Sequence, residues 1–328
     1  MIIDFHAHII TKSYIQMLKD RPTPPSLRKM DEEGYTVQYG RGLEYAVDAR
    51  MLSLERKLSE MDQAGVDTQV LSIAVPGVDC LEPGLAVKVA RAVNDELSDL
   101  AERSGGRFVC LAVAPLSDVS AAVDEVERAV GELGLRGVEV FSNLCGKPLD
   151  HPSLYPFYEA VSRLRVPVMV HPTSPAEPGG LMDYGLMTVV GFLFDSTLAV
   201  LRMVFSGLFE RFPDLKVVLP HAGATIPYLL WRIDHQFRIN PECRVRISRP
   251  PSEYLSKVYM DTAQNLHRPA MECFLRTVGS DRIVFGTDHP FANLKASVDG
   301  WKAVVEAEED REKVFWRNSA KILRLERA

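Results

Sequence analysis

The chain has 328 residues, of which 46% are hydrophobic and 25% charged, and its formal net charge is −6. This acidic balance disfavours nucleic acid as a partner, because nucleic-acid binding requires a basic patch or stripe. No apolar run approaches the length of a membrane span, and no basic leader with a cleavage site precedes the first apolar run. The five cysteines are scattered and lack a CxxC pair. We therefore expect a cytoplasmic protein with free thiols that binds neither membranes nor nucleic acid.

Short runs rich in valine and isoleucine alternate with amphipathic stretches along the whole chain. The runs are apolar on both faces, which is typical of strands in a covered parallel sheet. The eight predicted strands are residues 1–9, 68–75, 107–115, 137–141, 166–172, 216–223, 258–263 and 282–291. The predicted helices, in which apolar residues recur at helical spacing, are residues 84–103, 119–133, 197–212, 268–279 and 310–325.

This alternation, with no break in composition, predicts an α/β fold of the (β/α)8 barrel type that occupies residues 1–328 as a single domain. A doubly wound open sheet is the main alternative, but no GxGxxG follows the first strand. Two segments are longer than the loops that usually connect strands and helices. Residues 11–50 predict an irregular insertion over the barrel mouth, and the Pro/Gly-rich residues 172–191 predict a second lid loop. The last helix is expected to dock on the body.

Polar residues recur at the carboxyl ends of the predicted strands. His6 and His8 share one face of the first strand, because residues i and i+2 of a strand point the same way. His171, His221 and Asp288 end the fifth, sixth and eighth strands. In a barrel these ends meet at one mouth, where active sites are built. Imidazoles with one carboxylate suit a catalytic divalent metal, Zn²⁺ first, with Mn²⁺, Fe²⁺ or Co²⁺ as alternatives.

Four motifs in order, DFHAH, VMVHP, VVLPHAG and FGTDHPF, resemble the amidohydrolase superfamily. The branch most similar is that of 2-amino-3-carboxymuconate 6-semialdehyde decarboxylase, and the likeness extends to residues 61–77 and 207–223. The resemblance implies that His6, His8, His171 and Asp288 bind the metal. It also implies that the sixth-strand histidine, His221, is the acid/base, with Asp288 assisting the proton network. Sister decarboxylases carry glutamate in place of the first histidine, and this chain keeps histidine.

The resemblance further implies arginines that bind a substrate carboxylate. Arg232 occupies the place of an arginine that acts across a subunit interface, which implies a homodimer or larger homo-oligomer. The alternative for Arg232 is an ion pair on the helix surface with Asp234 or Glu242. For the second arginine, which precedes residues 61–77 in the family, Arg41 and Arg50 both remain open.

These inferences predict a metal-dependent, non-oxidative decarboxylase of an unsaturated or aromatic carboxylic acid, with a small-molecule carboxylate as substrate and no organic cofactor. The runner-up is a hydrolase or hydratase of a lactone, amide or enol acid, because one scaffold carries many chemistries. A barrel kept only for binding or assembly would be expected to lack some ligand positions, and here all are filled.

Neighbouring residues carry secondary expectations. Asp4 and Thr287 are predicted to orient the ligands. His289 is predicted to point away from the metal, because adjacent strand residues face opposite sides. Phe192 and Phe194 follow the second lid loop and either pack on the substrate or belong to the core, with the core favoured.

Overall fold

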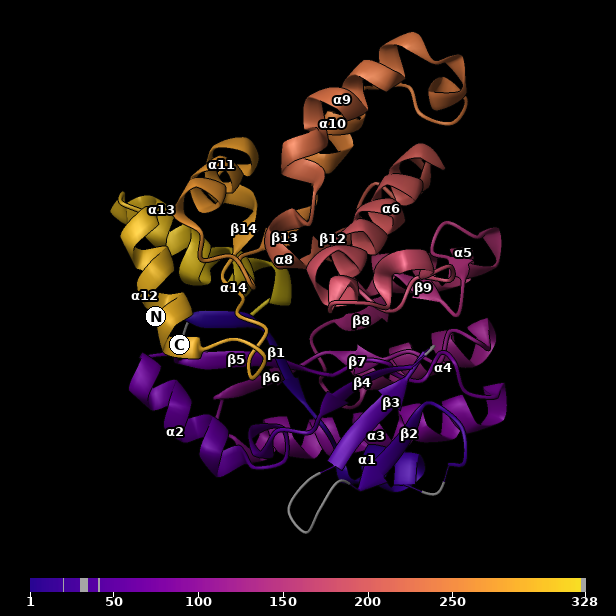
Figure 1. Ribbon diagram of the computed structural model, residues 1–328, viewed down its shortest axis with the longest axis vertical. Helices are drawn as coiled ribbons and strands as arrows, with labels where there is room; N and C mark the ends of the chain where they lie inside the picture. Colours follow the sequence, from indigo (N-terminus) through magenta and orange to yellow (C-terminus); the bar gives the residue numbers. More distant parts are fainter. Residues whose placement is uncertain (20, 30–34, 41, 326–328) are drawn as a thin grey trace.

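The computed structural model describes residues 1–19, 21–29, 35–40 and 42–325. Parallel strands form its centre and helices surround them (Figure 1). One sheet has the order β1-β5-β6 and the other the order β14-β13-β12-β11-β8-β7. Their bounds are Ile3–Ile9 (β1), Thr68–Ile73 (β5), Phe108–Cys110 (β6), Ala112–Val113 (β7), Val138–Phe141 (β8), Pro167–His171 (β11), Lys216–Leu219 (β12), Tyr259–Asp261 (β13) and Ile283–Val284 (β14).

The chain itself joins the two sheets at one seam, and backbone hydrogen bonds join them at the other. At one seam only Leu111 separates β6 from β7: its N–H donates to Leu71, whereas the next N–H, of Ala112, donates to Gly137. The predicted strand 107–115 is therefore split because it pairs with a different neighbour in each half. At the other seam Phe5 and His8 donate to the carbonyls of residues 285 and 289. The predicted eight-stranded barrel is confirmed, although its ladders form two sheets and not one continuous one.

The covering helices follow the predicted alternation. In α4 (Val119–Gly131), Asp118 caps the first turn by accepting from the Ala121 N–H, and one face is buried. The C-terminal α14 (Asn318–Leu323) contacts β1 and β14, as expected of a docking helix. The other helices are α2 (Leu54–Ala64), α3 (Pro83–Arg103), α5 (Tyr155–Leu164), α6 (Phe192–Phe205), α7 (Leu208–Arg211), α8 (Pro220–Gly223), α9 (Ile226–Ile239), α10 (Pro251–Leu255), α11 (Arg268–Val278), α12 (Leu294–Val304) and α13 (Glu308–Glu312).

The insertion after β1 is more regular than predicted. Within its described residues it contains α1 (Lys12–Lys19) and an antiparallel sheet of β2 (Ser26–Lys29), β3 (Tyr35–Tyr39) and β4 (Leu43–Ala46). The prediction of an irregular segment is wrong because β3 and β4 are short antiparallel strands that pair directly with each other, and the side chains of β4 alternate in burial. Arg41 lies outside the described residues.

The second lid segment becomes largely helical at its end. A π-helical turn, Met187–Gly191, continues directly into α6. By length and composition alone, Met187–Phe205 could cross a membrane. One face of α6, including Val200, Met203 and Val204, is buried in the core, and α6 contacts β11. This burial is typical of a core helix, and a core helix can have this length and composition without crossing a membrane.

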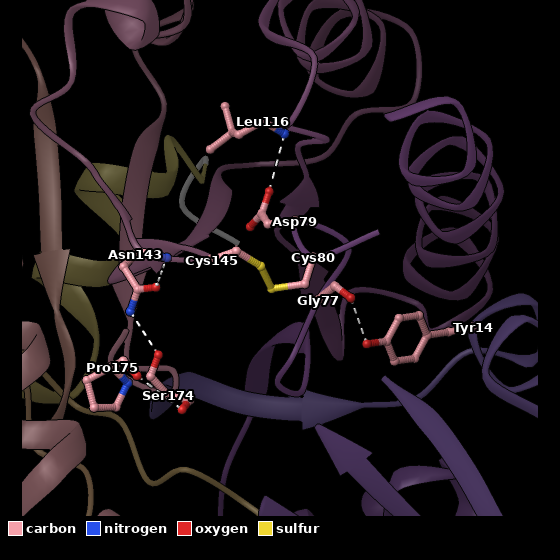
Figure 2. The surroundings of a disulfide bond; sticks show 10 residues. Tyr14, Gly77, Asp79, Cys80, Leu116, Asn143, Cys145, Ser174 and Pro175 are labelled. Carbon is pink, nitrogen blue, oxygen red and sulfur yellow. Dashed lines mark hydrogen bonds between the residues drawn. A yellow bond between two sulfur atoms is a disulfide. The ribbon is translucent and has the colours of Figure 1, made fainter. Parts of the chain in front are cut away.

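One cysteine pair contradicts the expectation of free thiols throughout. Cys80, in the loop after β5, is disulfide-bonded to Cys145, in the turn between β9 (Asn143–Leu144) and β10 (Lys147–Pro148), with the two Cα atoms 5.7 Å apart. Figure 2 shows the bond joining these two loops. The pairing was missed because 65 residues separate the cysteines along the chain, and only the fold brings their loops together. Cys110, Cys243 and Cys273 are free.

Candidate active site

The five predicted site residues converge at the carboxyl ends of the barrel strands. One ligand atom each from His6, His171, His221 and Asp288 lies within 4.8 Å of all the others. His8 completes the group, because its Nε2 is 3.1 Å from His6 Nε2 and 3.0 Å from Asp288 Oδ1. Both histidines of β1 are fully buried. These five residues therefore lie together at the mouth, as expected from the rule that the carboxyl ends of barrel strands meet there.

Two buried atoms of the four predicted metal ligands lack any hydrogen-bond partner in the described part of the chain: His171 Nε2 and Asp288 Oδ1. The other ring nitrogen of His171 lies 2.8 Å from the Pro172 carbonyl, which leaves Nε2 free to face the cluster. Burial lowers the pKa of His171 well below its usual value, so Nε2 keeps the lone pair that a metal ligand requires. A divalent cation among these atoms would satisfy both orphaned groups, so the residues fit a metal.

A carboxylate that sequence reasoning missed supports the cluster from behind. Asp261, at the end of β13, places Oδ2 2.7 Å from His6 Nδ1, and its Oδ1 accepts the His221 N–H at 2.8 Å. Burial alone would lower the pKa of His6, but Asp261 and Asp288 outweigh it and raise that pKa to about 9. The signal was available, because Asp261 lies near the carboxyl end of the predicted strand 258–263, as the other site residues lie near the ends of theirs.

Asp4, in β1, and Thr287, just beyond β14, are the residues predicted to orient the ligands, and they hydrogen-bond to each other. Thr287 Oγ1 donates to Asp4 Oδ2 at 2.7 Å, and the Thr287 N–H donates to Asp4 Oδ1 at 2.9 Å. This pair ties β1 to the segment that carries Asp288. His289 points away from the cluster, as predicted: its ring nitrogens lie 2.9 Å from Lys57 Nζ and 2.7 Å from Glu60 Oε2.

His221 reaches the cluster through a strained turn. Its φ is +58° and that of Ala222 is +52°, a left-handed region that non-glycine residues rarely adopt. Asp288 is also left-handed, with φ +67°. Such strain persists where the surrounding structure enforces it, often at functional sites. The turn leaves His221 Nε2 3.5 Å from Asp288 Oδ2 and its Nδ1 without a partner among the described residues.

A cavity of about 990 Å³ opens above the cluster. Most of its wall is apolar, and part of it comes from β3 and β4 of the insertion. Among its described lining residues there is no arginine or lysine. The aromatic part of the wall consists of Tyr39, Tyr45, Phe192, Tyr228, Phe274 and Phe291. Phe192 is therefore a cavity residue, whereas Phe194 is 57% exposed; neither belongs to the buried core.

The arginines lie outside this cavity. Arg50 donates to Asp48 at 2.6 Å and 2.8 Å and lies 3.4 Å from Glu60 Oε2, so its guanidinium is held beside the start of α2. Arg232 is exposed on α9, a helix that projects from the barrel body at the top of Figure 1. Within the described residues Arg232 forms no ion pair with Asp234 or Glu242. Asp234 instead accepts from Ser252.

The sequence model of the family described as amidohydrolase matches residues 3–325. The chain belongs to the amidohydrolase family. Among curated relatives, the gamma-resorcylate decarboxylase of Polaromonas sp. is 32% identical over 293 residues, which cover 85% of this chain and 90% of the relative. The 2-amino-3-carboxymuconate-6-semialdehyde decarboxylase of Dictyostelium discoideum is 31% identical over 247 residues, covering 75% and 68% respectively.

Solved structures extend this likeness to the amidohydrolase fold. A crystal structure of a dihydroxybenzoic acid decarboxylase from Polaromonas sp., with bound manganese and the inhibitor 2-nitroresorcinol, aligns with a TM-score of 0.84 and 28% identity. The alignment covers 100% of this chain and 98% of the other. The predicted family and barrel are confirmed.

Proposed function

We propose that this amidohydrolase is a metal-dependent, non-oxidative decarboxylase of an unsaturated or aromatic carboxylic acid. The observation that carries the proposal is the cluster of His6, His8, His171 and Asp288 beneath a cavity with an aromatic wall. The names of the relatives, which decarboxylate gamma-resorcylate or a carboxymuconate semialdehyde, support the same reaction class.

His6, His8, His171 and Asp288 would hold one divalent metal. When bound, such an ion supplies positive charge that polarises substrate oxygens or lowers the pKa of a water molecule. His221, beside the cluster, would deliver a proton to the carbon that loses CO₂. The C–C bond breaks, its electron pair stays on that carbon, and the proton from His221 completes the C–H bond. Asp288, 3.5 Å from His221 through Oδ2, would assist this proton transfer.

For the metal we infer Zn²⁺ first, because three imidazoles, which are neutral when they bind a metal, and one carboxylate form a nitrogen-rich ligand set. Mn²⁺, named in the structure of the Polaromonas decarboxylase, is the leading alternative, followed by Fe²⁺ and Co²⁺. Elemental analysis of protein purified without added metal distinguishes them.

The reaction class is tested by isotope labelling. Carboxylated muconate semialdehydes and hydroxybenzoates are screened for CO₂ release, and the product mass is measured in D₂O and in ¹⁸O-labelled water. Decarboxylation places one solvent deuterium on the carbon that carried the carboxyl group. Entry of ¹⁸O without CO₂ release, for every substrate that turns over, would overturn the decarboxylase and favour the hydrolase or hydratase.

We further propose that the active form is a homodimer or larger homo-oligomer in which Arg232 serves a neighbouring subunit. Its helix α9 exposes a large aromatic surface, with Tyr228 87% and Trp231 70% exposed. Exposed apolar patches of this kind mark interaction surfaces. Among its described residues the cavity wall has no arginine or lysine. This supports a site in which an arginine from the neighbouring subunit binds the substrate carboxylate.

Mixed oligomers test the shared site. Arg232→Ala is expected to raise KM about tenfold, equivalent to about 1.4 kcal/mol of binding, and Arg238→Ala, on the same helix, is the control. Mixing Arg232→Ala with His221→Ala subunits should restore activity at low substrate concentration, because one site of each mixed pair is complete. A fully active monomer by light scattering, or mixtures no more active than their parents, would exclude a shared site.

Arg50 is the second arginine that we propose for the substrate carboxylate, in a conformation released from Asp48 and Glu60. We therefore expect Arg50→Ala to raise KM for the carboxylate substrate. An unchanged KM would show that Arg50 only forms ion pairs with Asp48 and Glu60 and does not bind the substrate.

We also retain the proposals of one domain over residues 1–328 and of a cytoplasmic location. Fractionation of the native cells tests the location, since the Cys80–Cys145 bond removes part of the argument from free thiols.

A further inference from the structure

Gln264 occupies an unusual backbone position at the cavity wall. It lies three residues beyond β13, and its φ is +55°. The left-handed region suits glycine and, to a lesser degree, asparagine or aspartate, and other side chains adopt it at a cost. A strained non-glycine residue that persists in a site is a reason to ask what its side chain does.

The side chain of Gln264 contacts Asp288. Its Nε2 donates to Asp288 Oδ2 at 3.0 Å. The other oxygen, Oδ1, has no hydrogen-bond partner in the described part of the chain and lies 3.3 Å and 3.0 Å from the Nε2 atoms of His6 and His8. The two carboxylate oxygens thus have separate surroundings: Oδ1 faces the histidine cluster, and Oδ2 faces the amide of Gln264.

The Gln264 amide can fix the rotation of the Asp288 carboxylate. The Asp288 carboxylate rotates broadly about its last bond unless its oxygens are held. A donor on Oδ2 holds Oδ1 towards the histidines and keeps Oδ2 near His221, 3.5 Å away. Hydrogen bonds to a metal-binding carboxylate from its surroundings orient it in this way.

We propose that Gln264 is a positioning residue that acts through Asp288, aiming Oδ1 at the metal and Oδ2 at His221. The inference deepens the proposed function and rests on its metal site. Gln264→Gly removes the amide and relieves the left-handed backbone, so this variant is expected to fold. Gln264→Glu keeps the size of the side chain but replaces the donor with an acceptor that repels Asp288.

Arg165 offers a matched control for the backbone change. It is also left-handed, with φ +59°, and it is exposed at the end of α5. It does not line the cavity. Arg165→Gly therefore changes a strained residue to glycine without touching the cluster, and its melting temperature shows what that change does to stability alone.

The test follows release of Mn²⁺ from the loaded protein into a chelating dye, with kcat, KM and melting temperature. Gln264→Gly and Gln264→Glu are expected to release Mn²⁺ about 10–100-fold faster and to lose kcat by a similar factor, the range for groups that orient metal ligands. Arg165→Gly should match the wild type in Mn²⁺ release rate and in kcat. Gln264→Gly and Arg165→Gly should each melt at or above the wild-type temperature. Wild-type release rates and kcat in the two Gln264 variants would overturn the positioning role alone. A wild type that binds no divalent cation would overturn the metal site with it.

Discussion

The histidine cluster and the cavity wall above it are built from different parts of the chain. The cluster residues sit at or just beyond barrel strand ends, are almost entirely buried, and are hydrogen-bonded from behind by groups such as Asp261. The wall comes largely from the insertion and from helices beyond the strands, is mostly apolar, and includes exposed residues such as Tyr228.

This difference separates chemistry from selectivity. Strand ends are fixed by backbone hydrogen bonds on both sides, so they can hold several ligands within a few ångströms of a common point. Connecting segments tolerate substitution and insertion, so they can change the size and shape of the cavity without disturbing the ligands. Variants in the cluster should therefore abolish metal binding or turnover, and variants in the wall should mainly change substrate binding.

The largest effect is expected for the double variant His6→Ala/His8→Ala. It removes half of the proposed ligands, and the metal content should fall from about one ion per chain to almost none. Elemental analysis and circular dichroism measure the metal and the fold. The double variant His151→Ala/His235→Ala, which removes two histidines outside the cluster, should keep its metal. A folded His6/His8 variant with undiminished metal would disprove the site.

His221→Ala should lower kcat by roughly 10²–10⁴-fold, the usual contribution of a positioned acid or base. Most of the metal should remain, because His221 is assigned to proton transfer and not to metal binding. Steady-state kinetics with metal analysis on the same preparation make the distinction. Joint loss of metal and activity would instead make His221 a ligand, and turnover near that of the wild type would remove it from the mechanism.

Asp261→Asn should weaken metal binding by about 10–100-fold, because it removes the charge that orients the His6 ring through Nδ1. Competition with a chelator measures the affinity. Asp234→Asn is the control, since Asp234 accepts from Ser252 on the projecting helices, away from the cluster. Equal affinities in the two variants would show that the cluster holds its metal without help from β13.

The smallest effect is expected in the wall. Phe192→Ala should raise KM roughly tenfold with little change in kcat, because it removes apolar contact that substrate and transition state share. Phe194→Ala, two residues along the same helix and exposed, should leave both constants unchanged. A large fall in kcat for Phe192→Ala would show that the wall takes part in the chemistry and would break the separation of the two regions.

Sequence reasoning reached the barrel and its cluster because both depend on local patterns. Valine-rich runs at regular intervals predict parallel strands, and a polar residue at a strand end predicts its place at the mouth. The same rule applies to Asp261, which was missed because its predicted strand, residues 258–263, contains no histidine and none of the four family motifs. The regular strands of the insertion were also missed, because they are short and lie within a polar segment rich in turn residues.

The sequence by itself determined the alternation of strands and helices, the family, and the identity of the residues that meet at the mouth. Only the tertiary structure decided which partners those residues have. Asp261 behind His6, the amide of Gln264 on Asp288 and the bond between Cys80 and Cys145 all join positions that are at least 24 residues apart in the chain. Their contacts depend on strand register and loop path, which side-chain periodicity along one segment does not encode.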